Sequence, residues 1–395
     1  MADLGFRSID ADQHYYEALD ACTRHLDPAY KDRGIQVVTQ GKRTFLLAGR
    51  EMWRFIPNPT FDPVIVPGCN DLMFRGQVPE GVDPKALVRI EPRHAEYQDR
   101  AARIAVLDEQ DVERTFVFPT LGCGLEQALR FDVPALMASV SAFNRWLEDD
   151  WGFEREGRIL SAPIVCLADP ALALTEVDEL IARGVRMVCM RPAPAPDGRG
   201  NGRTHGDPAH DAVWARLAEA GIPVAFHLSD SGYEVLSKYW GGPERFEPFF
   251  GISAVQKLVV SDRAIHDTIG SMVLDGLFHR HPTLRVASVE NGSDWVALLV
   301  KRLHKMRNQM PSVFHEDPLD TISRHVWVTP YYEEDLRALA DLIGVERLLF
   351  GSDWPHGEGL SEPNDFVKEL HAFSEAEIRQ VMRTNALEFV GDTAD

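Results

Sequence analysis

Several side chains of the types that bind metal ions stand at the ends of short apolar runs in this sequence. Asp12 and His14 end the first such run, and His227 ends another. Glu290 and Asp353 end two further runs. Two imidazoles and two or three carboxylates make a mixed nitrogen and oxygen site, which suits zinc, manganese or iron better than calcium or magnesium. The sequence therefore predicts a site for a divalent metal ion, with zinc as the preferred ion.

No single one of these residues predicts the site. A histidine at the end of a strand is more often a hydrogen-bonded structural residue, and Asp-x-His occurs by chance in many proteins. Asp353, which is followed by Trp-Pro, would also serve as a simple turn former. The joint occurrence after four separate runs is what favours a metal site, with Asp12, His14, His227 and Asp353 as its main ligands.

These residues can meet only if the runs that carry them are strands of one sheet. Short apolar runs alternate with longer amphipathic stretches, which is the pattern of parallel βα units. The predicted strands are Ser8–Asp12, Arg114–Pro119, Ile159–Leu167, Val185–Met190, Pro223–His227, Leu284–Glu290, His325–Thr329 and Arg347–Asp353. Eight such units predict a (β/α)8 TIM barrel, in which the carboxyl ends of the strands bring catalytic groups to one face. We predict that all 395 residues form one domain.

Apolar residues at helical spacing predict the helices between these strands. The predicted helices are Gln98–Asp108, Val133–Asp149, Pro170–Arg183, Asp211–Ala220, Ala264–His279, Asp294–Met306 and Glu334–Leu342. A capping box, Ser374 with Glu377, predicts the start of a final helix through Phe389.

Two long excursions depart from this alternation, one after the first strand and one after the fifth. The first covers residues 21–93 and includes a predicted hairpin of Ile35–Val38 and Thr44–Leu47. It is placed either as a lid over the substrate pocket or as a segment that only covers the side of the barrel. The second, Leu228–Arg263, is predicted to border the pocket. It carries the aromatic residues Tyr233, Tyr239, Trp240, Phe246, Phe249 and Phe250.

The composition narrows the class of partner. The chain has 61 acidic and 41 basic residues, a net charge of −20, and no stripe of Lys and Arg, which argues against nucleic acid and anionic membrane as partners. No apolar run reaches the length of a membrane span, and no secretory signal stands at the start. Five scattered cysteines suit reduced thiols. We expect a cytoplasmic protein with a small-molecule substrate, and a homodimer is compatible with the general prevalence of symmetric oligomers.

The sequence resembles the amidohydrolase-related branch of the amidohydrolase superfamily, which includes metal-dependent hydrolases and decarboxylases related to aminocarboxymuconate-semialdehyde decarboxylase. The resemblance rests on Ile9–His14 with Glu17, on Phe226-His227, on Val289–Gly292 and, most specifically, on Leu349–His356. It implies that the four main candidates are the metal ligands. It also implies that Asp353 is the proton shuttle.

Two departures from the superfamily pattern stand out. The usual His-x-His is here Asp12-Gln-His14, and no lysine ends the fourth strand, where binuclear members carry a carbamylated ligand. The fourth strand leads instead into Arg191, and the absence of the lysine favours a single metal ion. The sixth strand ends in Glu290 rather than histidine, so Glu290 is either a further ligand or a support for one.

Three functions are compatible with these residues. The first is hydrolysis of an amide, ester, lactone or thioester by metal-activated water. The second is non-oxidative decarboxylation of an aromatic or unsaturated acid, and the third is ligand binding without catalysis. An intact ligand set argues against the third, and we predict a hydrolase first and a decarboxylase second.

Further residues have predicted roles at this site. Besides Asp353 and His227, the predicted catalytic residues are Arg191 and His356. Arg191 either binds a substrate carboxylate or makes a structural ion pair, and His356 orients the substrate or Asp353.

The remaining candidates have weaker roles. Glu17 could support His14, and His94 could reach the barrel mouth. His325 is predicted to begin the seventh strand, at the end of the barrel away from the site, and so to be structural.

Overall fold

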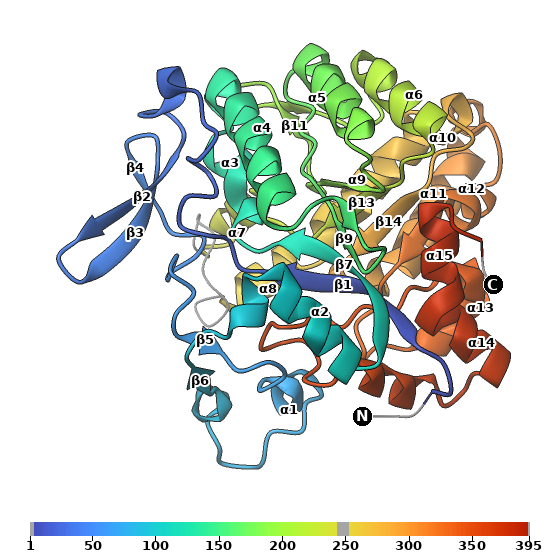
Figure 1. Cartoon of the computed structure of the whole chain (residues 1–395). Coiled ribbons are helices and arrows are strands. Elements are labelled where there is room, and N and C mark those ends of the chain that lie inside the picture. Colours follow the sequence, from blue (N-terminus) through green and yellow to red (C-terminus); the bar gives the residue numbers. More distant parts are fainter. Residues whose placement is uncertain (1–3, 243–252, 394–395) are drawn as a thin grey trace.

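Parallel strands enclosed by helices form the body of the molecule in the computed structural model, which describes residues 4–242 and 253–393 (Figure 1). One sheet has the strand order β1-β7-β9-β8 and the other has the order β10-β13-β14-β15. Every pair within these sheets is parallel except β8 with β9. The strands are β1 (Ser8–Tyr15), β7 (Val112–Pro119), β8 (Glu154–Arg155), β9 (Ile159–Ser161), β10 (Val188–Met190), β13 (Val224–His227), β14 (Val286–Val289) and β15 (Val326–Val328).

Parallel bridges join the two sheets into a closed barrel. Ile164 bridges to Cys189 between the first sheet and the second. On the other side, residues 348–354 take the eighth position: Leu348 bridges to Val328, and Trp354 bridges to Gln13 of β1. The predicted eighth strand is therefore an extended segment held by single bridges rather than by a regular ladder. The predicted (β/α)8 barrel is confirmed.

The strands are buried on both faces, and their side chains form two apolar layers. One layer fills the barrel interior with alternate residues such as Ile9, Ala11, Phe116 and Ala225. The opposite faces pack against the surrounding helices. Burial on both faces explains the nearly continuous apolar runs in the sequence.

The helices largely follow the predicted pattern. They are α1 (Asp71–Phe74), α2 (Arg100–Glu109), α3 (Leu125–Ala128), α4 (Val133–Asp150), α5 (Pro170–Ala182), α6 (Asp211–Ala220), α7 (Glu234–Lys238), α8 (Ala254–Val260), α9 (Arg263–Leu274), α10 (Leu277–Arg280), α11 (Asp294–Gln309), α12 (Pro318–His325), α13 (Leu336–Ile343), α14 (Glu375–Arg379) and α15 (Asn385–Val390). The predicted capping box of Ser374 and Glu377 is present.

Several predicted boundaries were wrong. The strand predicted over Ile159–Leu167 ends at Ser161, and a π-helical turn, Gln380–Thr384, interrupts the predicted final helix between α14 and α15.

Two further errors concern the segments before the sixth and seventh strands. The helix predicted over Ala264–His279 is broken by Gly276, which has a φ of 68° and separates α9 from α10. His325 does not begin the seventh strand but ends α12, because Asp317 and Pro318 start a helix that the apolar pattern did not reveal. Strand β15 begins one residue later, so His325 still lies at the amino end of the strand.

The segment after β1 forms a small antiparallel sheet, which projects from the barrel at the left of Figure 1. It contains β2 (Ile35–Gln40), β3 (Arg43–Ala48) and β4 (Glu51–Trp53), and the β2–β3 hairpin is as predicted. Downstream, β5 (Val64–Ile65) pairs with β6 (Ile90–Glu91). This second part contacts the barrel mouth, since the Gly68 amide donates to the His356 carbonyl at 3.2 Å.

The second excursion is only partly described. Tyr239 and Trp240 are largely exposed, and the Tyr233 hydroxyl lies 3.4 Å from Asp267 Oδ2. Phe246, Phe249 and Phe250, which were predicted to border the pocket, lie outside the described residues.

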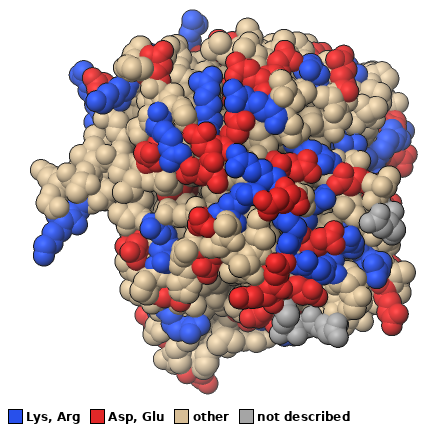
Figure 2. Space-filling view, in the orientation of Figure 1, with Lys and Arg blue, Asp and Glu red and all other residues tan. Residues whose placement is uncertain are grey.

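Charged side chains of both signs are mixed over the face that Figure 2 shows, apart from the projecting sheet, which carries basic residues mainly at its tip. Among the residues that the structure describes, the helices are too short or too polar to cross a membrane.

Candidate metal centre

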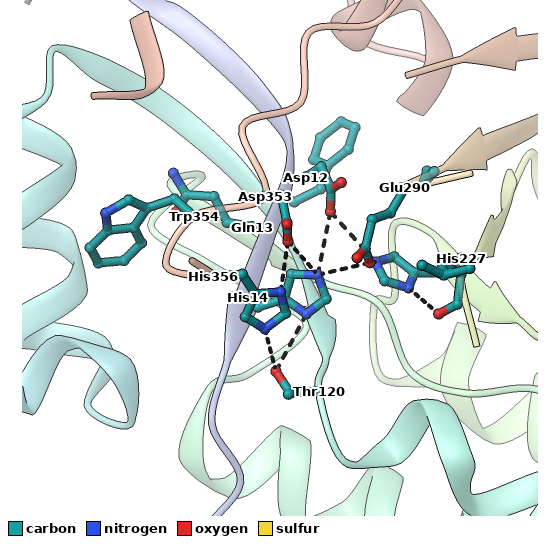
Figure 3. A network of polar contacts seen from close by, with 12 residues as sticks. Asp12, Gln13, His14, Thr120, His227, Glu290, Asp353, Trp354 and His356 are labelled. Carbon is teal, nitrogen blue, oxygen red and sulfur yellow. Dashed lines mark hydrogen bonds and ion pairs between the residues drawn. The ribbon is translucent and has the colours of Figure 1, made fainter. Parts of the chain in front are cut away.

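The predicted ligands meet at the carboxyl ends of the barrel strands (Figure 3). His227 Nε2 lies 3.5 Å from Asp12 Oδ1 and 3.2 Å from Glu290 Oε2. His14 Nε2 lies 3.7 Å from Asp12 Oδ1, 3.5 Å from Glu290 Oε2 and 3.4 Å from Asp353 Oδ1. The structure thus brings together residues from β1, from β13 and from the segments after β14 and after the eighth strand.

One atom from each of the four main ligands is buried without a hydrogen bond. These atoms are Asp12 Oδ1, His14 Nε2, His227 Nε2 and Asp353 Oδ1. Leaving a buried polar atom unpaired costs about 1–3 kcal/mol each. Four such atoms directed at one another are the arrangement expected where a cation completes the bonding.

The two imidazoles are held in the form that binds a metal ion. His14 Nδ1 lies 3.2 Å from the Pro119 carbonyl, and His227 Nδ1 lies 2.9 Å from the Leu228 carbonyl. A carbonyl only accepts, so each Nδ1 carries the proton and donates it. In the neutral ring each Nε2 then keeps a lone pair directed at the site. Burial opposes the charged form of His227, but Cys123 and Asp12 raise its pKa to about 10, so a metal ion would displace a proton from this ring.

The acidic side chains are driven toward their neutral forms when no cation is bound. Burial raises the pKa of the Glu290 and Asp353 carboxyls well above their usual range, and neighbouring carboxylates add to the effect. Burial also lowers the pKa of the His14 imidazole. A divalent cation would reverse this preference, because its charge stabilises the ionised carboxylates. The residues present therefore fit a divalent metal ion.

Two of these carboxylates depart from extended backbone geometry. Glu290 has a φ of 57° and Asp353 has a φ of 56°, both in the left-handed region that non-glycine residues rarely adopt. Such conformations cluster at functional sites, where the surrounding structure holds them in place. In both cases the turn comes directly after a strand.

Strand β1 reaches the site through a bulge. Its pairing with β7 slips between Asp10 and Gln13, where β1 has one residue more than β7. Ile9 faces the barrel interior before the bulge, and His14 faces the site after it. Within the bulge, Ala11 belongs to the interior layer and Asp12 to the site. The alternation that placed Asp12 and His14 on one side is correct, but the bulge is what turns that side inward.

His356 lies beside the candidate ligands, with a ring nitrogen within 4.8 Å of ligand atoms of His14, Glu290 and Asp353. Its Nδ1 lies 2.7 Å from Asp353 Oδ1, and its ring is tilted by 32° against that of His14, with centroids 4.0 Å apart. Its Nε2 lies 3.2 Å from Thr120 Oγ1, and this hydroxyl donates to the Tyr15 carbonyl at 2.9 Å. Sequence reasoning missed Thr120, although a polar residue directly after the predicted second strand was an available signal.

Arg191 lies outside this cluster in the part of the chain that the structure describes. It is buried, and its Nε lies 2.9 Å from Glu126 Oε1. Its other nitrogens donate to Gln127 Oε1 at 3.0 Å and to the Pro194 carbonyl at 2.8 Å. These contacts match the structural alternative rather than the substrate-binding one.

Two weaker candidates are also placed. Glu17 does not contact His14 but accepts the backbone amides of Thr120, Leu121 and Gly122 at 2.9–3.0 Å. It therefore holds the loop whose Pro119 carbonyl orients His14. His94 is exposed and lies 3.2 Å from Glu96, away from the cluster.

Comparison with known proteins places the chain in a family. The family model described as Amidohydrolase matches residues 9–391. The solved structure of an amidohydrolase from Mycobacterium avium subsp. paratuberculosis K-10 is 54% identical, with 98% of this chain and 100% of that chain covered and a TM-score of 0.94. The 5-carboxyvanillate decarboxylase of Sphingomonas paucimobilis shares the fold, with 15% identity, 98% and 100% coverage and a TM-score of 0.62.

A curated relative matches over a shorter region. The 2-amino-3-carboxymuconate-6-semialdehyde decarboxylase of Dictyostelium discoideum is 25% identical over 198 residues, which are 48% of this chain and 51% of the relative. The chain thus aligns with about half the length of this relative. The family match along nearly the whole barrel, together with the ligand cluster at its mouth, shows that the chain belongs to the amidohydrolase family.

Proposed function

We propose that this protein is a metal-dependent decarboxylase that releases CO2 from a small carboxylic acid without an oxidant. The position of Asp353 carries the proposal. Oδ1 of this carboxyl group lies 3.4 Å from Nε2 of the candidate ligand His14 and 2.7 Å from His356 Nδ1. The same acid can thus lie beside a bound substrate and exchange a proton with an imidazole behind it.

The chemistry requires one proton and no redox partner. A divalent cation at this site would supply Lewis-acid polarisation of a substrate oxygen. The bond between the carboxylate and its carbon breaks, CO2 leaves, and the electron pair stays on the carbon. Asp353 delivers a proton to that carbon, and His356 can return one to Asp353. The net change is the replacement of CO2 by a proton.

Stacked rings beside the cluster suggest which acids would bind. His356 packs against His14 in a tilted arrangement and is stacked on Tyr16, with centroids 6.0 Å apart. Tyr16 is in turn stacked on Phe61 at 4.6 Å. Rings in this arrangement favour planar ligands. We therefore expect aromatic or unsaturated acids to react faster than saturated ones. The curated relative, which is a decarboxylase, supports the same class of reaction.

Hydrolysis, which the sequence favoured, is the second candidate. The same Asp353 carboxylate could take a proton from water and pass it to a leaving group. The 54% identical solved structure is that of an amidohydrolase, which supports hydrolysis as the alternative reaction.

The two reactions differ in the atoms that enter the product. The protein would be loaded with zinc, manganese or iron(II) and incubated with aromatic, unsaturated and saturated acids, and with esters, amides and lactones. We expect CO2 release, with one deuteron from D2O on the carbon that lost it. Incorporation of ¹⁸O from labelled water without CO2 would contradict decarboxylation and favour hydrolysis.

One variant that should lose turnover and one control variant accompany this assay. Asp353→Asn should slow turnover by about 10²- to 10⁴-fold, the usual contribution of general acid catalysis. His304→Gln changes a histidine that pairs with Asp317 2.8 Å away on the helical shell, and it should leave turnover unchanged.

A further inference from the structure

A buried carboxylate outside the candidate ligand set connects the two strands that carry Asp12 and Asp353. Asp10 is fully buried, and its side chain accepts hydrogen bonds from both strands. From β1, the Asp12 amide donates to Oδ1 at 3.2 Å and Gln13 Nε2 donates to Oδ2 at 2.9 Å. From the eighth strand, the Ser352 amide donates to Oδ1 at 3.0 Å and Ser352 Oγ donates to Oδ2 at 2.5 Å.

The first pair of hydrogen bonds spans the bulge in β1. The slip in the β1–β7 pairing lies between Asp10 and Gln13, the same two residues that Asp10 Oδ2 connects. The bond to the Asp12 amide fixes the second of the two residues between them. Because this bulge turns Asp12 inward, the Asp10 side chain holds the backbone that aims the Asp12 carboxylate.

The second pair holds the turn at Asp353. Ser352 comes directly before Asp353, and its hydroxyl also accepts the Trp354 amide at 3.1 Å. The Asp353 amide in turn donates to the Asp12 carbonyl at 2.9 Å. Of the two residues that flank Asp353, Ser352 is therefore bound to Asp10 and Trp354 is bound to Ser352 Oγ. These bonds keep Asp353 in its left-handed conformation.

A buried arginine is connected to Asp10 through the side-chain amide of Gln13. Arg103 is fully buried, and it donates to Gln13 Oε1 at 3.2 Å and to the His14 carbonyl at 2.6 Å. Its guanidinium lies 4.5 Å from the centre of a Trp354 ring. Gln13 thus accepts from a cation on one side and donates to an anion on the other, which fixes the orientation of its amide.

We infer that Asp10 is a positioning residue that sets the geometry of both acidic ligands, Asp12 through the bulge and Asp353 through Ser352. The inference rests on the metal site of the proposed function, but not on which reaction occurs there. Residues that orient metal ligands change metal affinity by about 10- to 100-fold when they are replaced.

Asp10→Asn is the direct test, because it keeps the size of the side chain but puts an amide N–H against donors. We expect metal affinity, measured by competition with a chelator, to fall by about 10- to 100-fold. The visible absorption of bound Co²⁺, which reports ligand geometry, should also change. Both measurements use folded protein well below its melting temperature and need no substrate.

Ser8→Ala is the matched control. Ser8 lies on the same strand as Asp10, but at the end away from the site. Its replacement removes a buried hydrogen bond of 2.6 Å to Asn364. It should lower the free energy of unfolding and leave metal affinity unchanged. Equal metal affinities in the wild type, Asp10→Asn and Ser8→Ala would overturn the inference.

Ser352→Ala covers the case in which Asp10→Asn does not fold. It removes only the hydroxyl bonds on the eighth strand, so we expect a smaller loss of affinity in the same direction. Wild-type affinity in Ser352→Ala would refute the role of Asp10 at Asp353. Failure of the wild type itself to bind any metal would instead refute the proposed function.

Discussion

Both ends of the barrel carry clusters of ionisable side chains, but their partners differ. At the amino ends of the strands, Asp392 accepts hydrogen bonds from both Arg114 and Arg186. There, Arg383 also forms a bidentate ion pair with Glu113, at 2.6 and 3.0 Å. At the carboxyl ends, carboxylates and imidazoles face one another, and four of their buried atoms make no hydrogen bond. Acidic residues stand at both ends, but they meet arginines at the amino end and imidazoles and one another at the carboxyl end.

This difference separates stability from function. Charges that meet opposite charges need no further partner, whereas like groups gathered in a buried site remain unfavourable until a cation arrives. Substitutions at the mouth should therefore remove metal binding at little cost to the fold. Substitutions among satisfied residues should lower stability and leave the chemistry intact.

The largest expected effect is at the mouth. Asp12→Ala/His14→Ala removes two of the four main ligands, so we expect elemental analysis to find no bound metal and turnover to be lost. His227→Ala should behave in the same way. In the double variant, the loss of Asp12 relieves the crowding of acidic groups and offsets part of the cost of truncating the buried His14 ring, so the free energy of unfolding of the metal-free protein should change little. A variant that retains about one equivalent of metal and full activity would contradict the assigned site.

Arg191 tests the comparison further, because it follows β10 at the carboxyl end of the barrel and yet forms an ion pair with Glu126. Arg191→Met leaves the buried Glu126 carboxylate without its partner, which should lower the free energy of unfolding by about 3–5 kcal/mol. Denaturant unfolding would measure it. A rise in KM with unchanged stability would instead show that Arg191 binds the substrate carboxylate.

His325 tests the opposite end of the barrel. Its Nδ1 donates to the Leu284 carbonyl at 2.7 Å, and its ring is stacked on Phe278 with centroids 4.8 Å apart. Truncation of this buried side chain by His325→Ala should cost about 2–3 kcal/mol of stability, with kcat unchanged at temperatures where the protein is folded. Loss of turnover without loss of stability would place the site at the wrong end.

The smallest effect concerns the exposed capping box of α14. Hydrogen bonds from Ser374 and the nearby Arg337 lower the pKa of Glu377 from 4.5 to about 2. A depressed pKa contributes stability above the unfolded value that is lost as the pH falls through the folded value. We expect the stability difference between wild type and Glu377→Gln to shrink between pH 6 and pH 2. A difference that is constant over this range would contradict the role of the carboxylate.

The sequence was sufficient for the parts of the structure that local patterns determine. The apolar runs gave the barrel strands, and the polar residues at their ends gave the ligand cluster. The bulge at Asp10–Gln13 and the left-handed turns at Glu290 and Asp353 could not be predicted. The bulge depends on the pairing with β7 and on Ser352, which binds Asp10, while the turns at Glu290 and Asp353 are held by Thr329 and Asp12. These partners are far away in sequence, so neither propensity nor periodicity reveals the bulge or the turns. For the same reason the loop-binding role of Glu17 was not foreseen.

The contact between β1 and the eighth strand also has a consequence for how the protein folds. Asp10 and Ser352 are 342 residues apart, so their contact closes nearly the whole chain into one loop. Contacts of such separation are costly in conformational entropy and tend to form late in folding. A nascent chain that has not yet added residues 348–354 lacks Ser352 and Asp353 and cannot assemble the complete ligand set. Capture of the cation would therefore coincide with the last step of barrel closure and stabilise only the finished protein.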